Sequence, residues 1–281
     1  MNLANALAAA ADRLASSGIP EPRREASSLI ANAIDRDRVF LIAHPEYVLT
    51  EREAAAVDEF ITRRSAREPF QYIVGRQEFY ALDFLVNSSV LVPRPETELL
   101  VQRAIDDLRM IDEPRFCEIG VGSGCISISV LKNVPTATAI AADISDAALA
   151  IAEANARRHN VLDRLELIRS DLFDDLPLGP YHAILSNPPY IPADEIAGLQ
   201  PEVRDFEPTT ALTDGSSGIE VVRKIIHGAP NCLLEGGLLI LEIGAGQFES
   251  VDRIFDRNVW RSVDVLLDLQ QIPRTVIAIK K

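Results

Sequence analysis

Short apolar runs alternate with segments of helical pattern in this chain from Pro114 onward. The runs that predict strands are Arg115–Glu118, Thr138–Ala142, Leu165–Arg169, His182–Leu185, Leu238–Leu241, Val263–Leu266 and Thr275–Ile279. Helical segments lie between most of them, including Asp146–Arg158 and Gly218–Ile226. Such alternation builds a mainly parallel sheet with helices on both faces and a ligand at the carboxyl ends of its strands. The sequence therefore predicts an α/β protein.

The first part of the chain has a different pattern. Its apolar residues recur at helical spacing, and Thr50 with Glu53 forms a capping box ahead of a further helix. A length of 281 residues suggests two domains. We expect residues 1–69 to form a helical domain, and the sequence leaves open whether that domain grips a substrate or only assists folding.

Between residues 70 and 92 the pattern changes to short β-rich runs. These runs are Gln71–Val74 and Phe79–Val86, separated by Gly75. They predict a β-hairpin linker over residues 70–92. Pro95 is suited to the first turn of a following helix, so we expect residues 93–281 to form the α/β domain.

Composition excludes several classes of function. The formal net charge of −14 and the pI of about 4.8 argue against a broad nucleic-acid-binding surface. The four histidines are far apart in the sequence, so we expect no metal site. The Ala-rich stretch Ala4–Ala11 has no preceding Lys or Arg and predicts a helix instead of a signal peptide. We expect a cytoplasmic protein whose cysteines are buried free thiols: Cys117, Cys125 and Cys232.

A glycine-rich turn follows the first predicted strand of the α/β region. It contains Gly120, Val121, Gly122, Ser123 and Gly124 and leads into a helix. Glycine lets the backbone approach a ligand where a Cβ would collide. The spacing is G-x-G-x-G, whereas the dinucleotide fingerprint requires glycine at the position of Cys125. Pyrophosphate binding is therefore the weaker interpretation.

Two acidic residues follow the next two strands. Asp143 lies about 20 residues beyond the glycine turn, where a carboxylate accepts hydrogen bonds from both ribose hydroxyls of a nucleoside. Ile144, which follows it, is assigned to the same site. Asp171 is placed to accept from an adenine amino group while Leu172 covers the ring, and the other interpretation of Asp171 is a turn cap.

The tetrapeptide Asn187-Pro188-Pro189-Tyr190 follows the fourth strand. The Asn187 side-chain oxygen and the Pro188 carbonyl can each accept one N–H of an NH2 group. Pro189 stiffens the loop, and the Tyr190 ring offers a face to a planar substrate. This arrangement suits methylation of a planar, poorly nucleophilic nitrogen, whose lone pair is withdrawn by resonance. Asn187 is assigned to both the acceptor pocket and the cofactor site.

Together, these four motifs at consecutive strand ends predict one S-adenosylmethionine site with an acceptor pocket beside it. An exocyclic amine of adenine or guanine is also planar, so a nucleic-acid methyltransferase remains an alternative. The acidic composition counts against that alternative. A protein that only binds S-adenosylmethionine is a third interpretation, although a sensor has no need for paired carbonyl acceptors.

The chain resembles the release factor glutamine methyltransferases of the HemK/PrmC type nearly end to end. The combination of Pro93-Arg94-Pro95-Glu96-Thr97-Glu98 with Asn187–Tyr190 is the most specific part of this likeness. Further matching segments are Glu68-Pro69, Tyr72–Gly75, the glycine turn, Asp143, Asp171 with Phe173, Glu207-Pro208, Ala211-Leu212, Asp268 and Arg274. Two positions depart from the usual pattern, with Glu118 where Asp is more frequent and Val121 where Thr is common.

The resemblance implies a helical N-terminal domain, a hairpin linker and a class I methyltransferase domain with a seven-stranded sheet. It also implies a reaction, the transfer of methyl from S-adenosylmethionine to the side-chain amide nitrogen, N5, of a glutamine. The implied partner is a class I peptide chain release factor, whose Gly-Gly-Gln motif carries that glutamine. A glutamine methyltransferase for a ribosomal protein would share the catalytic motif and remains the nearest alternative.

Overall fold

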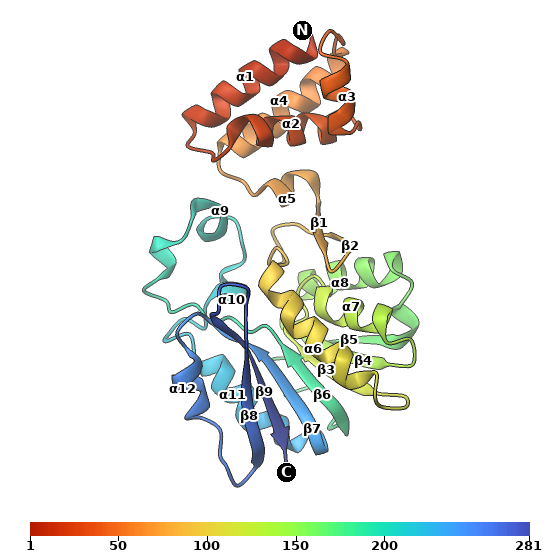
Figure 1. The fold of residues 1–281 in the computed structure, drawn as a ribbon, viewed down its shortest axis with the longest axis vertical. Coiled ribbons are helices and arrows are strands. Elements are labelled where there is room, and N and C mark those ends of the chain that lie inside the picture. Colours follow the sequence, from red (N-terminus) through yellow and green to blue (C-terminus); the bar gives the residue numbers. More distant parts are fainter. The chain divides into compact units, whose positions relative to one another are not determined.

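The structure is a computed structural model that describes residues 1–281, and it contains two compact units (Figure 1). One unit comprises residues 1–76 with 200–206, and the other comprises residues 77–199 with 207–281. The expected hairpin segment, residues 70–92, is therefore divided between the two units. Each unit has its own apolar core and is described by itself.

The larger unit is built on a seven-stranded sheet with the strand order β5-β4-β3-β6-β7-β9-β8. All pairs are parallel except β7 with β9 and β8 with β9. The strands are β3 (Arg115–Ile119), β4 (Thr138–Asp143), β5 (Leu165–Arg169), β6 (Tyr181–Ser186), β7 (Leu233–Glu242), β8 (Trp260–Leu267) and β9 (Pro273–Lys280). Each of the seven strands expected after Pro114 is present in this sheet, so the predicted fold class is confirmed.

Helices cover both faces of this sheet (Figure 1). On one face lie α6 (Glu98–Leu108), α7 (Cys125–Asn133) and α8 (Asp146–Arg158), and on the other α11 (Glu220–Gly228) and α12 (Phe248–Asp252). Apolar residues at helical spacing explain this packing, as in α6, where Leu100, Ala104 and Leu108 are fully buried. The short helices of this unit are η1 (Pro95–Thr97), η2 (Leu162–Arg164), η3 (Ile196–Gly198), α10 (Thr209–Leu212) and η4 (Ala229–Asn231).

A two-stranded hairpin, β1 (Arg76–Phe79) and β2 (Leu82–Leu85), precedes the sheet in the chain. Phe79 and Phe84 are buried in the core formed with α6, α7 and α8. The Asn155 side chain on α8 accepts from Leu85 N at 2.7 Å and donates to Leu85 O at 3.0 Å and to Ser123 O at 2.9 Å. One buried side chain therefore ties the hairpin to the glycine turn.

The smaller unit is a bundle of short helices. They are α1 (Leu3–Ser16), α2 (Pro22–Ala33), α3 (Arg38–Ala43), α4 (Glu51–Ser65) and α5 (Phe70–Val74), with α9 (Pro201–Arg204) contributed by the later segment. The core contains Leu14, Leu29 and Ile30, which are fully buried. The predicted capping box of Thr50 and Glu53 is present at the start of α4.

The prediction of a strand at Gln71–Val74 is wrong, because these residues form helix α5. Pro69 provides the N-cap and Gly75 ends the helix with a left-handed φ of 75°. Tyr72 and Ile73 are buried within that single turn. The β-branched composition favoured a strand, but a helical turn bounded by Pro69 and Gly75 buries the apolar residues equally well.

A buried ion-pair cluster joins residues 200–206 to α4. Arg64 is 5% exposed, and its guanidinium contacts the carboxylates of both Glu25 and Glu202. Glu202 also pairs with Arg67 at 2.7 Å. Burial alone would raise the pKa of Glu202, but the hydrogen bonds from Arg67 and Arg64 outweigh it and lower that pKa.

The three cysteines are all buried, as predicted. No helix combines the length and the apolar content that crossing a membrane demands. The structure also brings no group of three or more His, Cys, Asp or Glu side chains together in an arrangement that could hold a metal ion.

Replacement of Asn155 by Ala should destabilise the larger unit by about 2 kcal/mol or more, because three backbone groups lose their partner. Trp260 is the only tryptophan and is buried in this unit, so its fluorescence in a urea titration reports the unfolding. Asn231→Ala is the matched control, since Asn231 is exposed. Equal midpoints for the two variants would contradict the role given to Asn155.

Candidate active site

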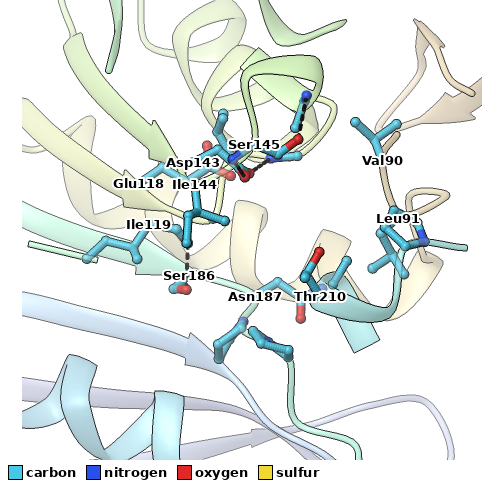
Figure 2. A pocket seen from close by; sticks show the side chains of 18 of the residues that line it. Val90, Leu91, Glu118, Ile119, Asp143, Ile144, Ser145, Ser186, Asn187 and Thr210 are labelled. Atoms are coloured by element: carbon cyan, nitrogen blue, oxygen red, sulfur yellow. Dashed lines mark hydrogen bonds between the residues drawn. The ribbon is translucent and has the colours of Figure 1, made fainter. Parts of the chain in front are cut away.

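A cavity of about 290 Å³ lies at the carboxyl ends of β3, β4, β5 and β6. Its lining includes residues that follow each of these four strands, among them Gly120, Asp143, Asp171 and Asn187. Figure 2 shows Asp143 and Ser145 on one side of the cavity and Val90 and Leu91 across from them. The four motifs that the sequence places at consecutive strand ends are therefore brought together in one site.

The glycine turn forms one wall of the cavity. Gly120 and Gly122 have φ of +78° and +52°, and a Cβ built on either would meet no atom within 4 Å. Both line the cavity, together with Val121 and Ser123, so the absent side chains leave room for a ligand. Gly124 does not line it. A Cβ there would lie 2.8 Å from Ile128 Cδ1, so Gly124 allows the close packing at the start of α7.

Asp143 ends β4 and is fixed by two backbone donors. Its carboxylate accepts from Gly122 N at 2.9 Å and from Ser145 N at 3.0 Å. Each carboxylate oxygen keeps a lone pair for a ligand hydroxyl. Ile144, the next residue, lines the same cavity and is 54% exposed. Asp143 and Ile144 therefore line the same cavity, and the contact of Asp143 with a ribose stays a prediction.

Asp171 and Leu172 follow β5 and both line the cavity. Leu172 has a left-handed φ of 53°, which is unusual for a residue with a Cβ. Its carbonyl accepts a hydrogen bond from the Ser170 hydroxyl at 3.1 Å, which helps to hold this conformation. The side chain of Asp171 makes no hydrogen bond within the chain, so a turn-capping role is not seen and its carboxylate is free for a ligand.

Glu118 is a cavity residue that sequence reasoning did not assign to the site. It is 1% exposed, and Oε2 accepts from the backbone N–H and hydroxyl of Ser127. Oε1 has no hydrogen-bond partner. Burial raises the pKa of Glu118 to about 8, with the Ser127 hydrogen bonds opposing that shift and the charge of Asp143 adding to it.

Asn187 and Pro188 present two free acceptors. Asn187 Nδ2 donates to Thr97 Oγ1 at 3.1 Å, and its Oδ1 accepts nothing from the chain. The Pro188 carbonyl likewise accepts no hydrogen bond. Both residues, with Pro189, line the cavity. The Thr97 contact therefore fixes which end of the Asn187 amide faces the acceptor site.

Tyr190, by contrast, is not among the residues that line the cavity. Its hydroxyl donates to Glu242 Oε1 at 3.1 Å, and its carbonyl accepts from Gln247 Nε2 at 2.8 Å. Burial and the neighbouring Glu242 carboxylate raise the pKa of Tyr190, so it stays a neutral donor. The expected stacking of its ring on a substrate is replaced by a contact that anchors the loop.

Two segments more than 100 residues apart meet beside the cavity. Arg94 NH2 lies 2.6 Å from Glu207 Oε1, and Arg94 and Pro208 both line the cavity. Glu207 is buried, and burial raises its pKa although the Arg94 charge lowers it. The Pro93–Glu98 and Glu207-Pro208 motifs were both noted in the sequence, but their pairing was not predicted.

Further lining residues carried no recognisable signal in the sequence. They include small and apolar side chains from the segment after β2, from the strand ends and from α10, namely Val90, Leu91, Ser145, Ser186 and Thr210. The Ser186 hydroxyl donates to Ile119 O at 2.7 Å, which joins the ends of β6 and β3 (Figure 2). Only the folded chain identifies these residues.

The shape of the cavity and the polar groups around it fit S-adenosylmethionine. The cavity volume is close to the lower end of the range of about 300–1,000 Å³ for small-molecule sites. The cavity-lining face of the glycine turn leaves space that any Cβ would fill, and Asp143 presents acceptors suited to a diol. The unpartnered Glu118 Oε1 suits a cationic donor such as an ammonium group.

Comparison with known proteins agrees with the assignment of the cavity to a methyltransferase. A model described as the PrmC N-terminal domain matches residues 5–75, and one described as the methyltransferase small domain matches residues 95–198. A release factor glutamine methyltransferase of Cereibacter sphaeroides is 42% identical over 99% of this chain and 98% of its own. One of Geobacter sulfurreducens is 40% identical over 94% of this chain and 91% of its own.

Among solved structures, a methyltransferase from Pyrococcus furiosus resembles this chain with a TM-score of 0.54 and 18% identity. The match covers 78% of this chain and 98% of that one. At this identity the likeness concerns the fold.

Gly122→Ala should weaken binding of S-adenosylhomocysteine about tenfold or more, since an inserted methyl costs about 1–3 kcal/mol in a packed site. Gly236→Ala is a matched control, because Gly236 also has a positive φ, of +74°, and open space around its Cβ, but lies outside the cavity. Both variants should lose about 1–2 kcal/mol of stability from backbone strain. Calorimetric titration measures the affinity, and equal affinities in the two variants would contradict the assignment of the turn.

Proposed function

This chain belongs to the family of release factor glutamine methyltransferases, and we propose that its substrate is the glutamine of the Gly-Gly-Gln motif of a class I release factor. The enzyme uses S-adenosylmethionine and methylates the side-chain amide nitrogen, N5. A protein that modifies release factors acts where translation terminates, so we also propose a cytoplasmic location.

The pair of free acceptors at the cavity carries this proposal. Asn187 Oδ1 and the Pro188 carbonyl are both without a donor in the chain. A primary amide has two N–H groups, and these two acceptors match them in number and kind. Secondary amines and hydroxyl groups would leave one of the two acceptors without a donor from the substrate, which is costly when the bound substrate takes that acceptor out of water.

The two acceptors orient the substrate for transfer. S-adenosylmethionine bound in the cavity would supply an electrophilic methyl group, so that the amide nitrogen gains an N–C bond as the C–S bond breaks and S-adenosylhomocysteine is the leaving group. Asn187 and Pro188 hold the amide with its nitrogen at the cofactor side of the pocket, and such orientation can supply roughly 7–11 kcal/mol of barrier reduction. The neutral Asn187 amide cannot take the proton, so we assign no strong base, and the proton leaves after the transfer.

We also propose that the helical unit, residues 1–69 in the sequence-based division, recognises the protein substrate. Its core is complete in itself, as expected of a separate binding module. The outer side of α3 carries Val39 and Ile42, which are 69% and 78% exposed. Large exposed apolar side chains on a small bundle support a protein-binding surface.

Asn187→Ala should lower kcat on the release factor by about a hundredfold or more, the usual effect of removing one aimed hydrogen-bonding group from an active site. Affinity for S-adenosylhomocysteine should stay close to that of the unchanged protein, because the glycine turn and Asp143 are intact. Labelled methyl transfer and calorimetry give the two quantities.

Asn231→Ala, an exposed change of the same type, serves as the control and should keep full activity. Near-normal turnover of Asn187→Ala would show that the acceptor is elsewhere.

A further inference from the structure

The segment Glu242–Gln247 contacts the acceptor loop from outside the cavity. It runs from the last residue of β7 to the N-cap of α12, and none of its residues lines the cavity. We propose that Gln247 is a positioning residue, which holds the loop after β6 so that the Pro188 carbonyl stays aimed at the substrate amide. The proposal rests on the function proposed above, because it concerns the same acceptor.

The Gln247 side chain bridges two backbone groups. Its Nε2 donates to Tyr190 O at 2.8 Å, and its Oε1 accepts from Gly244 N at 2.8 Å. A backbone N–H can only donate, so the Gly244 contact fixes which end of the Gln247 amide faces the acceptor loop. Gln247 therefore presents its NH2 group to Tyr190 and holds the carbonyl of that residue.

Two glycines allow other segments of the chain to pack directly against Tyr190. A Cβ on Gly244 would lie 2.9 Å from Gln247 Oε1 and 3.2 Å from Cδ2 of the Tyr190 ring. A Cβ on Gly218 would lie 2.2 Å from the Tyr190 carbonyl oxygen. The Tyr190 hydroxyl donates to Glu242 Oε1 at 3.1 Å. The ring, the hydroxyl and the carbonyl of Tyr190 are thus all held from outside the cavity.

The contacts of Tyr190 matter because the two prolines before it make no backbone hydrogen bond. Neither Pro188 nor Pro189 has an N–H, and their carbonyls accept none. The proline rings fix both φ angles, so few torsions remain free between Asn187 and Tyr190. Asn187 is held by its hydrogen bond to Thr97 Oγ1 at 3.1 Å. Fixing Tyr190 as well sets the direction of the Pro188 carbonyl.

Helix stability does not explain the glutamine at position 247. Gln247 is the N-cap of α12, but its side chain makes no capping hydrogen bond. Ser, Thr, Asp and Asn are the residues that favour this position, because their short side chains reach the first N–H groups of the helix. The Gln247 amide is instead directed to the acceptor loop.

The test is single-turnover methyl transfer by the full chain, loaded with labelled S-adenosylmethionine and mixed with excess release factor. The amount of product counts the folded, loaded molecules, whereas the rate constant depends on how the acceptor is oriented. Gln247→Glu still accepts from Gly244 N, but its carboxylate cannot donate to Tyr190 O. The rate constant should fall about tenfold to a hundredfold, the effect of a small misplacement in an active site, with the amount of product unchanged.

Gln270→Glu, the same change at an exposed position, is the matched control and should leave both quantities unchanged. Gln247→Met removes both hydrogen bonds at similar side-chain length and should lower the rate constant at least as much as Gln247→Glu. An unchanged rate constant in either Gln247 variant would overturn the proposal. A loss confined to the amount of product would also contradict it, since that result marks a residue needed only for folding.

A carbon-13 NMR spectrum separates this proposal from the function on which it rests. In the full chain with S-adenosylhomocysteine and carbonyl-labelled proline, the Pro188 signal is assigned by its loss in Pro188→Ala. This signal should move in Gln247→Glu and stay in place in Gln270→Glu. An unmoved signal in Gln247→Glu would refute the positioning role. If the unchanged protein did not methylate a release factor, the proposed function would fail, while this spectrum would still decide the role of Gln247.

Discussion

The parallel pairing of β3 with β4 and β6 is the constraint on which the rest of the structure depends. Ile119 at the end of β3 is opposite Ala142 on one side and Ser186 on the other, so the three strands end together. Hydrogen bonds from Gly120 N to Ala142 O and from the Ser186 hydroxyl to Ile119 O extend this alignment past the last ladder pairs. A shift of one residue would turn the site-forming side chains to the wrong face of the sheet.

Burial of carboxylates distinguishes the surroundings of the cavity from the rest of the protein. Glu118, Glu207 and Glu242 are the buried acidic residues, and each has one oxygen without a hydrogen-bond partner. Glu118 lines the cavity, Glu207 pairs with the lining residue Arg94, and Glu242 contacts the acceptor loop. Buried, incompletely paired charges cost stability and are found where function requires them.

The sequence predicted those features of the fold and of the site that depend on a single segment of the chain. Periodicity located each strand of the sheet, and the glycine turn and Asn187 were found because single short motifs carry their chemistry. The prediction of a strand at Gln71–Val74 was wrong because it gave the β-branched composition more weight than the flanking Pro69 and Gly75, which bound a helical turn. The contacts of Asn187 with Thr97 and of Tyr190 with Glu242 could not be predicted, because they join the loop after β6 to η1 and to β7 and only folding creates them.

The most direct test of the central claim is methyl transfer from labelled S-adenosylmethionine to a purified class I release factor, with mass spectrometry to locate the added methyl group. The account predicts label on the glutamine of the Gly-Gly-Gln motif and none when that glutamine is replaced by alanine. An unlabelled release factor, with methyl transferred instead to a ribosomal protein or to RNA, would contradict the substrate assignment and leave only the cofactor site standing.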